Sequence, residues 1–377
     1  MIYLNNAATT YPKPQCVQEA CNNFLQQPPT GQFRSAFDES VPDIFTECRK
    51  KLGRLLGIKE QKRIFFTSGA TEALNKILYG LGIPASQTIV TATEHNSVLR
   101  PLYNIPSIQG TPVIVPCDRN GKVHPEELER YIKTDSRALV VNHCSNVTGC
   151  IQDMEQIGSI AKKHYLLFIA DISQSAGCIP VDVDGWMADA AAFTGHKSLF
   201  GIQGSGGYYI RDGVSFRPML FGGNGKDSST LLYNQNIYEY DAGTQNGVGA
   251  AALDAGTGYL LEKGVAHVQK EEQEKMRYLY EELSRMETLI LYGSAEENRG
   301  PVLSFNLKGL KAADTAYILQ NSYGIVSRAG LHCAPLIHSC LETGRHGSVR
   351  ISISEQNTWK ELEQFVSAVW EICRAAG

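Results

Sequence analysis

Short apolar segments recur through the first two-thirds of the chain, and segments with helical spacing of apolar residues separate them. Several of the apolar segments show little alternation with polar residues, which is typical of strands that are covered on both faces. Strands that alternate with helices predict an α/β protein with a mostly parallel central sheet and helices on both faces. Ligands of such sheets bind beyond the carboxyl ends of the strands. The predicted strands are residues 63–67, 88–92, 112–115, 138–142, 166–171, 189–193 and 206–210.

The last third of the chain has a different pattern. A long charged helical stretch, about residues 256–287, leads into a second region of helices and strands. Thr358 and Glu361 have the spacing of a capping box, so a helix is predicted to begin there. Its apolar positions follow helical spacing at Leu362, Phe365, Val366, Val369 and Ile372. We therefore predict a smaller α+β domain of residues 1–14 and 256–377 beside a large domain of residues 15–255.

Composition and charge exclude several classes of protein. The 377 residues include 35 Lys and Arg against 39 Asp and Glu, a net charge of −4, and no cluster of basic residues suggests nucleic-acid binding. No apolar run predicts a membrane-spanning helix, and the first residues do not resemble a secretory signal. We therefore expect a cytoplasmic protein. The 10 cysteines include no C-x-x-C pair, so most are expected to be core residues of a protein in a reducing compartment.

A turn of small residues, 68–72, joins the strand at 63–67 to a predicted helix. Backbone N–H groups at the start of a helix favour an anion such as a phosphate group. Taken alone, the segment is better explained as an ordinary helix cap. The chain has neither of the glycine patterns of dinucleotide-binding and P-loop proteins, so those two readings lose their support.

Two further residues stand at the ends of predicted strands. Asp171 ends the strand 166–171, where its carboxylate could hold the ring nitrogen of pyridoxal 5'-phosphate (PLP) or cap a helix. Lys197 closes a Thr-Gly-His-Lys sequence after the strand 189–193. A lysine reacts with an aldehyde only as a neutral amine, which requires desolvation or a nearby cation. The alternative is a surface lysine, as most lysines are.

Together these motifs resemble the PLP site of the class V aminotransferase family. Asp171-x-x-Gln174 is followed by the Thr-Gly-His-Lys sequence, with Lys197 standing 26 positions after the aspartate. The resemblance implies PLP fold type I and covers nearly the whole chain, from Tyr3 to the C-terminal helix. It also includes residues 93–97, 145–149 and 242–246.

The resemblance implies a role for each matching residue. Lys197 would form the Schiff base with PLP, and His95 would stack on the ring and move protons. Asp171 would pair with the ring nitrogen, Gln174 would bond the phenolic oxygen, and Asn146 would lie beside the ring and substrate. The residues implied to hold the phosphate group are Ala70, Thr71, Thr194 and His196. Similar proteins are homodimers with shared sites, so Thr244 would reach the phosphate in the partner's site.

The segment around Cys333 carries the most specific resemblance. Arg-x-Gly-x-His-Cys-Ala, at residues 328–334, is similar to the signature of cysteine desulfurases in the group that includes selenocysteine lyases. The resemblance makes Cys333 the sulfur acceptor. Only a thiolate attacks well, and Arg328 and His332 are expected to supply the positive charge that favours it. The alternative for Cys333 is a buried structural cysteine.

Arg350 matches the residue that binds the substrate carboxylate in this family. A guanidinium group suits that task because it can donate two parallel hydrogen bonds. The alternative is a surface ion pair of little energetic value. No metal site is predicted, because the spacing of His338, Cys340 and His346 fits no common zinc pattern.

The sequence thus predicts a PLP-dependent cysteine desulfurase that converts L-cysteine to L-alanine and leaves the sulfur on Cys333 as a persulfide. The expected catalytic residues are Lys197, Cys333 and His95, and the expected substrate-binding residues are Asn146, Arg328 and Arg350. A protein or a thiol would accept the sulfur. Three alternatives stay open: a selenocysteine lyase, a class V aminotransferase or epimerase that does not use the cysteine, and a PLP-binding scaffold that relays sulfur.

Three segments depart from the better-known desulfurases. Residues 31–35 and 222–225 match only loosely, and Glu355-Gln356 stands where an apolar or aromatic pair is expected. These differences leave the physiological substrate and sulfur acceptor open.

Overall fold

The computed structural model describes residues 1–28, 43–223, 229, 231, 242–293 and 299–376. In this part of the chain, the central sheet has seven strands in the order β2-β8-β7-β6-β5-β3-β4. Strand β8 runs antiparallel to its neighbours β2 and β7, and the other pairs are parallel. The strands are β2 (Ile64–Thr67), β3 (Thr88–Thr91), β4 (Val113–Val115), β5 (Ala138–Asn142), β6 (Leu167–Asp171), β7 (Ala190–Thr194) and β8 (Gly206–Ile210).

Each predicted strand is confirmed to within one residue at either end. The largest change is at β7, which starts and ends one residue later than predicted because Thr194 still pairs with Gly206 of β8. The side chain of Asp189 instead caps the neighbouring strand, with its carboxylate accepting a hydrogen bond of 2.8 Å from the N–H of Phe168. The prediction of a mostly parallel sheet in an α/β protein is confirmed.

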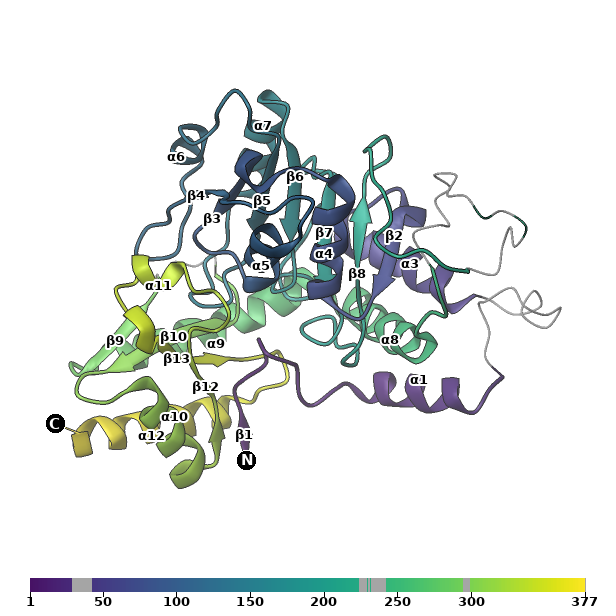
Figure 1. The fold of residues 1–377 in the computed structure, drawn as a ribbon. Helices are drawn as coiled ribbons and strands as arrows, with labels where there is room; N and C mark the ends of the chain where they lie inside the picture. The colour runs from purple at the N-terminus through teal and green to yellow at the C-terminus, as the bar shows by residue number, and fades with distance from the viewer. Residues whose placement is uncertain (29–42, 224–228, 230, 232–241, 294–298, 377) are drawn as a thin grey trace.

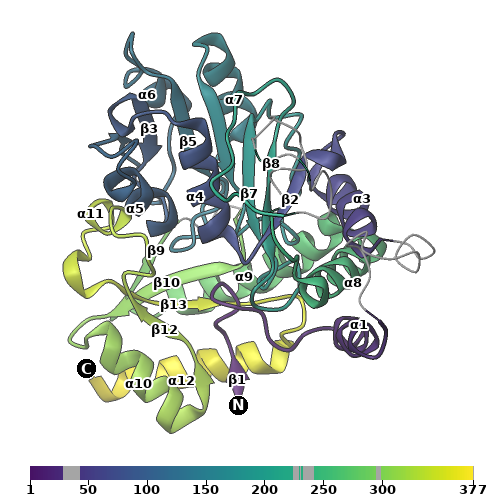
Figure 2. The same cartoon turned by 45° about the vertical axis from the view of Figure 1, so that its right-hand side comes forward.

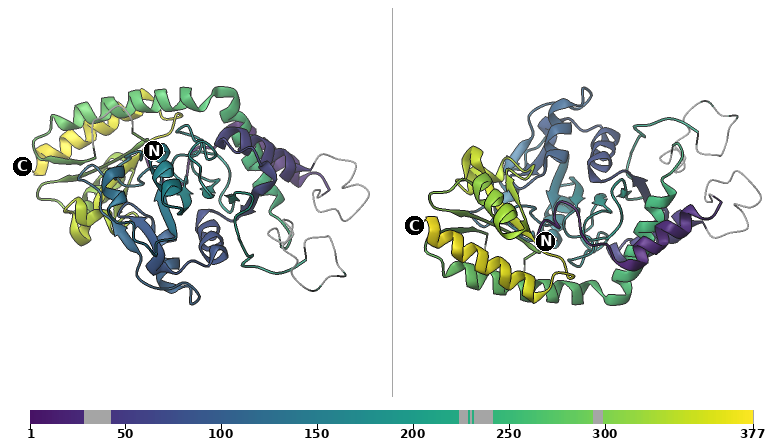
Figure 3. Two further views of the ribbon diagram at one scale, coloured as in Figure 1. Left: turned by 90° about the horizontal axis from the view of Figure 1, so that it is seen from above. Right: turned by 90° about the horizontal axis from the view of Figure 1, so that it is seen from below.

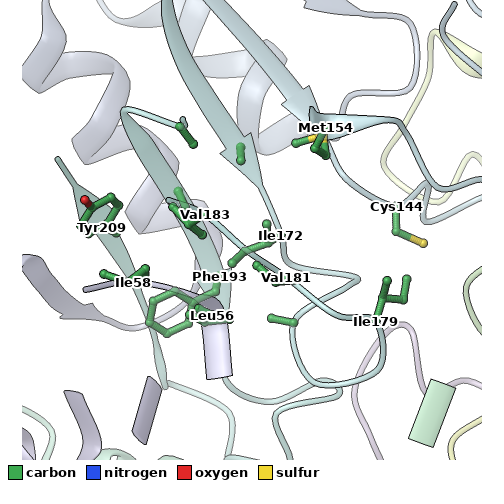
Figure 4. Close-up of a cluster of buried hydrophobic side chains, with 14 of the residues drawn as sticks. Leu56, Ile58, Cys144, Met154, Ile172, Ile179, Val181, Val183, Phe193 and Tyr209 are labelled. Carbon is green, nitrogen blue, oxygen red and sulfur yellow. The ribbon is translucent and has the colours of Figure 1, made fainter. Parts of the chain in front are cut away.

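Helices cover both faces of the central sheet (Figure 1). Neighbouring strand residues alternate between the faces, as the pleat requires. In β2, Ile64 packs with one group of helices and Phe65 with the other. Phe193, Leu56 and Tyr209 belong to the first cluster, shown in Figure 4. The helices of the first face are α3 (Ile44–Leu56), α7 (Met154–Lys163) and α8 (Gly247–Lys263), and those of the second are α4 (Ala70–Leu81) and α5 (Asn96–Asn104).

A second sheet lies beyond the carboxyl-terminal edge of the first (Figure 2). It is antiparallel, in the order β12-β13-β10-β9. Helices pack on it around a separate core that also takes in Ile2 and Leu4 from the start of the chain. Its strands are β9 (Leu289–Tyr292), β10 (Val302–Leu307), β12 (Arg328–Gly330) and β13 (Ser348–Ser352), and its helices are α9 (Val265–Ser284), α10 (Ala312–Tyr323) and α12 (Trp359–Ala376).

The remaining elements are short or peripheral. Strand β1 pairs in parallel with β11, and α1 packs against α8. Their bounds are β1 (Ile2–Tyr3), β11 (Ile325–Val326), α1 (Gln15–Leu25), α6 (Pro125–Glu129) and α11 (Ile337–Cys340). Among the described residues, no helix combines the length and apolar character needed to cross a membrane.

The capping box predicted for the last helix is confirmed. The N–H of Thr358 donates to Glu361 Oε2 at 2.8 Å, and the N–H of Glu361 donates to Thr358 Oγ1 at 3.3 Å. The predicted apolar positions of α12 are all buried in the second core. Figure 3 shows α12 lying beside the long helix α9.

The helical stretch predicted at about 256–287 is corrected by the structure. Two helices occupy this region, because α8 already begins at Gly247 and ends at Lys263, and α9 starts at Val265, after Gly264. Gly264 has a φ of 84°, a left-handed conformation that favours glycine and interrupts the helix. The predicted domain boundary between residues 255 and 256 lies inside α8, whose buried face packs on the central sheet. The division into two domains stays a prediction.

Candidate active site

A cavity of about 320 Å³ lies at the carboxyl ends of β6 and β7, between the central sheet and the second sheet. This is where an open α/β sheet is expected to bind its ligand. Both sheets and the start of the chain contribute to its wall. The lining residues include Ala7, Gly69, Ala70, Thr71, His95, Asn146, Asp171, Gln174, Thr194, His196, Lys197, Arg328, His332 and Arg350. The structure therefore brings most of the predicted site residues together.

Lys197 reaches the cavity from the loop that follows β7. The loop is held by backbone hydrogen bonds from Gly195 to Ser205 and from Phe200 to the carbonyl of Lys197. Burial lowers the pKa of Lys197 to about 8, an effect that the Asp171 carboxylate opposes and that Arg350 reinforces. Roughly a tenth of this amine is therefore neutral near pH 7, far more than for an ordinary lysine, and the neutral form is the one that reacts with an aldehyde.

Asp171 ends β6 and is buried, with 6% of its surface exposed. Its Oδ1 accepts hydrogen bonds from the N–H of Ser173, at 3.0 Å, and from the Ser173 hydroxyl. Gln174 follows in the same turn, and its Nε2 donates to the carbonyl of Ala7 at 3.1 Å. The turn thus presents a carboxylate to the cavity, which suits the protonated ring nitrogen of PLP.

The start of α4 forms a cradle for an anion. Gly69 precedes the helix with a φ of 151°, which strongly favours glycine, and a Cβ on Gly206 would lie only 2.6 Å from Gly69 Cα. Across from this turn, Thr194 Oγ1 and His196 Nδ1 are buried and have no hydrogen-bond partner within the described residues. Unpaired buried polar atoms beside a helix start fit a phosphate group that would complete their hydrogen bonding.

Thr71 also lies at this helix start, and its hydroxyl shares a hydrogen bond of 2.7 Å with the Ser97 hydroxyl. Burial lowers the pKa of His196 to about 4, with Lys197 and Lys13 adding to the effect. His196 is therefore neutral near pH 7, and Nδ1 can either donate to or accept from a ligand. The donor set of the cradle fits the phosphate group of PLP.

His95 caps α5 and faces the cavity. Its Nδ1 accepts a hydrogen bond of 3.0 Å from the N–H of Ser97, which leaves the proton of the neutral ring on Nε2. Burial, followed by the charge of Lys197, lowers the pKa of His95 to about 4. The next residue, Asn96, donates its N–H to the carbonyl of Cys333 at 2.7 Å, which ties this helix start to the Cys333 segment.

Cys333 is not among the residues that line the cavity; it lies in a tight turn directly after His332, which does line it. His332 and Cys333 both have left-handed backbone conformations, with φ values of 51° and 60°. Such conformations are uncommon for residues other than glycine, and they often occur at functional sites. Asn146 Nδ2 donates to the carbonyl of His332 at 2.6 Å, and Arg328 Nη2 donates to Cys333 Sγ at 3.4 Å. The turn is thus held by one side chain from the loop after β5 and one from β12.

The expectation that His332 supplies positive charge to this thiol is wrong. Burial, followed by Arg350 and Arg328, lowers the pKa of His332 to about 2, so the ring is neutral near pH 7. Its Nε2 lies 3.0 Å from the carbonyl of Ser348. Arg328 alone of the two predicted residues provides positive charge at Cys333 Sγ.

Arg350 lies in β13 and has only 1% of its surface exposed, so the alternative of a surface ion pair is wrong. Its Nη1 donates to the carbonyl of Asn146 at 3.0 Å, and its Nη2 donates to Asn5 Oδ1 at 3.2 Å. Nε is buried without a partner in the described structure. A buried guanidinium group that forms no ion pair with the described carboxylates is suited to bind a carboxylate ligand.

The family assignment rests on a match over nearly the whole chain. Residues 2–365 match the family model described as Aminotransferase class-V. The chain belongs to the class V aminotransferase family. Members of this family use PLP, and the cavity described above has the residues to hold it.

Relatives within the class V family are cysteine desulfurases. A probable cysteine desulfurase of Methanothermobacter thermautotrophicus is 31% identical, over 98% of this chain and 94% of the relative. The structure of a cysteine desulfurase from Thermococcus onnurineus superimposes with a TM-score of 0.90 at 30% identity, over 99% of this chain and 95% of the other. A cysteine desulfurase from Escherichia coli gives a TM-score of 0.88 at 25% identity, over 100% and 95% of the two chains.

One buried residue of this class V site was missed by the sequence analysis. Glu94 is fully buried, and its Oε1 accepts hydrogen bonds from Thr91 Oγ1 at 2.6 Å and from the N–H of Asn142 at 2.9 Å. Burial raises the pKa of Glu94 to about 8, although these hydrogen bonds oppose the shift. Asn142 is the direct strand partner of Asp171 and lines the cavity. The position of Glu94 just beyond the apolar strand β3 is a signal that could have identified it.

Two further expectations concern Thr244, as a residue that reaches a partner subunit, and His338, as a residue outside any metal site. Thr244 lies just before α8 and is not among the residues that line the cavity, so its role toward a partner subunit stays a prediction. His338 Nδ1 lies 2.7 Å from Thr343 Oγ1, and the described residues contain no group of three or more potential metal ligands.

The segments that depart from the desulfurase pattern are only partly visible. Residues 31–35 and 224–225 lie outside the described part of the chain. The structure explains why an acidic residue stands at position 355. The Glu355 carboxylate accepts a hydrogen bond from the Tyr259 hydroxyl and forms an ion pair with Lys263. Both partners belong to α8, so this acidic residue joins the last loop to that helix.

Proposed function

We propose that this chain is a PLP-dependent cysteine desulfurase, which converts L-cysteine to L-alanine and receives the sulfur on Cys333. The observation that carries the proposal is the hydrogen bond of 3.4 Å to Cys333 Sγ from Arg328, which lines the same cavity as Lys197. A half-buried thiol in a left-handed turn beside a guanidinium group is suited to nucleophilic attack.

The residues that would hold PLP come from the central sheet. The helix start at Ala70 and Thr71, together with Thr194 and His196, would bind the phosphate group. Asp171 would keep the ring nitrogen protonated, with Gln174 near the phenolic oxygen and His95 stacked on the ring. PLP, when bound, withdraws electrons from the bonds of the substrate α-carbon.

Arg350 and Asn146 would hold the substrate. Arg350 is buried and directed into the cavity, and its backbone partner is Asn146. A substrate carboxylate would gain two charge-assisted hydrogen bonds from the guanidinium group. Fixing the carboxylate orients the thiol end of L-cysteine, so that the geometry of attack is set before reaction.

Lys197 would move the proton. Its pKa, lowered to about 8, lets the neutral amine take the proton from the substrate α-carbon and return it later. His95 is neutral and carries its proton on Nε2. That N–H can donate a hydrogen bond to a ligand of the cavity without adding a charge to the site.

Cys333 would then accept the sulfur. Its thiolate attacks the substrate sulfur, forming an S–S bond while the bond between that sulfur and the substrate β-carbon breaks. The electron pair of the broken bond stays with the carbon, which takes a proton and becomes the methyl group of L-alanine. The net change is L-cysteine plus the Cys333 thiol giving L-alanine plus the Cys333 persulfide. A protein or a small thiol would remove the sulfur from Cys333.

The proposal extends to assembly and location. A homodimer would place Thr244 at the partner's cofactor phosphate, as the family resemblance implies. All 10 cysteines are free thiols, which suits a reducing compartment such as the cytoplasm.

The Cys333→Ala variant tests the reaction. We expect it to bind PLP with the visible absorbance of the wild type and to lose the formation of alanine from L-cysteine. Cys340→Ala is the matched control, because this cysteine is half-buried in the same segment. Normal alanine formation by Cys333→Ala would overturn the proposal.

Measurements of turnover distinguish the open alternatives. A selenocysteine lyase would turn over L-selenocysteine even without Cys333, because selenium leaves more readily than sulfur. An aminotransferase would require an added amino-group acceptor. A scaffold would release no alanine from L-cysteine, with or without a thiol acceptor.

A further inference from the structure

A second thiol site lies outside the cavity, where the loop after β4 packs against α11. Ile337 and Leu341 of the α11 region form a small apolar cluster with Val147 and Ala334, and Cys117 of the loop packs against it. On the rim of this contact, Arg119 forms an ion pair of 2.8 Å with Glu342. The loop and the segment that follows Cys333 therefore share one interface.

Two free cysteines face each other across this interface. Cys117 comes from the loop and packs against the cluster that contains Leu341, the residue that follows Cys340 at the end of α11. The two thiols are close enough to influence each other. Both residues are half-buried, so small reagents can reach them. Burial, followed by the nearby Cys340 sulfur, raises the pKa of the Cys117 thiol. The proposed mechanism uses neither thiol.

We propose that Cys117 and Cys340 form a reversible disulfide when the protein meets a low-molecular-weight disulfide such as oxidised glutathione. The Cys340 sulfur attacks the reagent, forming a mixed disulfide and releasing one glutathione thiol. The Cys117 sulfur then attacks the Cys340 sulfur and releases the second glutathione thiol. Both protein thiols lose a proton, and their two electrons reduce the reagent to two thiols.

The disulfide would restrain the segment that carries Cys333. Only three residues separate Cys333 from the start of α11, and the N–H of Ala334 donates to the carbonyl of Leu331 at 3.0 Å within this short connection. Anchoring the end of α11 to the loop after β4 therefore limits how far the Cys333 turn can move. The inference does not depend on the proposed reaction.

Peptide mapping of the Cys333→Ser variant tests the site, because this background removes the Cys333 thiol. After treatment with oxidised glutathione and digestion without reductant, we expect one peptide pair that joins Cys117 to Cys340, with the loss of two hydrogens. Cys117→Ser and Cys340→Ser, each in this background, should abolish the pair. Cys150→Ser is the matched control and should keep it, since Cys150 also lies near Cys117.

A second measurement follows the segment itself. Amide hydrogen exchange across residues 334–341 should slow on oxidation and return to its original rate with dithiothreitol. Cross-linking of Cys117 to Cys150, or only mixed disulfides with glutathione, would overturn the pairing. Unchanged exchange in cross-linked protein would overturn the restraint. Neither readout uses alanine formation, so failure here is distinct from failure of the proposed desulfurase reaction.

Discussion

Arg328 and Arg350 are direct partners across the antiparallel strands β12 and β13, so two guanidinium groups lie side by side at one wall of the cavity. Like charges directly opposite each other are unfavourable. Burial, followed by the charge of Arg328, lowers the pKa of Arg350 to about 9. Their hydrogen bonds diverge, since Arg328 donates to Cys333 Sγ and Arg350 donates to Asn146 and Asn5. The pair therefore places one positive charge beside the Cys333 sulfur and a second where it can meet an anionic ligand of the cavity.

Arg350→Lys is expected to weaken substrate binding. A lysine cannot reproduce two parallel hydrogen bonds to a carboxylate, and a hydrogen bond to a charged group contributes about 1.5–3 kcal/mol. The expected loss in kcat/KM for L-cysteine is therefore roughly 10- to 150-fold, carried mainly by KM. Steady-state alanine formation measures it. Arg328→Lys serves as the contrast and should lower kcat more than it raises KM, because Arg328 contacts the Cys333 sulfur. Equal effects on KM in both variants would contradict these separate roles.

Lys197→Met is expected to stabilise the protein without PLP while removing its reaction with the cofactor. The pKa of Lys197 is about 8 in the folded chain against an ordinary value of 10.5, so the unfolded chain binds more protons between these values. Stability of the wild type therefore rises with pH across this window. Below it, the folded wild type holds a charged amine at a cost of about 3 kcal/mol, which methionine avoids.

Urea unfolding of both cofactor-free proteins measures the difference. The variant should be more stable near pH 7, and the gap should close as the pH approaches 10.5. It should also lack the visible absorbance that the wild type gains with PLP. An unchanged visible spectrum would mean that another lysine binds the cofactor.

Glu94→Gln is expected to flatten the pH dependence of stability. The pKa of Glu94 is about 8 in the folded chain against 4.5 ordinarily, so the folded chain binds more protons between these values. Wild-type stability therefore falls as pH rises through this window, by up to about 1.4 kcal/mol per pH unit from this residue. The neutral amide removes that contribution. Denaturant unfolding across the window checks it, with Glu126→Gln as a control because its side chain is 72% exposed. Parallel slopes in all three proteins would show that Glu94 is ionised in the fold.

Phe365→Ala is expected to destabilise the second core. This ring is fully buried in α12, and its centroid lies 6.2 Å from that of Phe305. Truncating such a residue leaves a cavity and costs about 3–5 kcal/mol. Trp359→Ala in the same helix is the control, since that side chain is 46% exposed and should cost clearly less. Denaturant unfolding measures both losses of stability. Equal losses in the two variants would contradict the prediction that burial decides the size of the loss.

Much of the fold could be predicted because its signals are local. The strand at 138–142 is continuously apolar, and the structure places it inside the sheet with both faces covered. Thr358 and Glu361 form the predicted reciprocal cap because the contact needs only one helical turn. The break at Gly264 was missed, since the helical pattern of apolar residues continues on both sides of it.

Charge states in the site were harder to predict. Proximity to Cys333 in sequence suggested a charged His332, whereas burial makes that ring neutral. Glu94 offered the opposite case, an acidic residue whose proton is retained because its strand end is enclosed by the sheet. Protonation depends on how much water surrounds a group in the folded chain, and no short sequence pattern records that.

The sequence by itself determined the order of strands and helices and the positions of Asp171 and Lys197 at strand ends, because apolar periodicity and turn residues act over a few neighbours. Only the tertiary structure decided that Arg350 meets Asn5 across 345 positions of the chain and that Asn146 holds the His332 turn. Such contacts, and the pKa values that follow from them, arise when distant segments exclude water together, so they become defined only in the packed molecule.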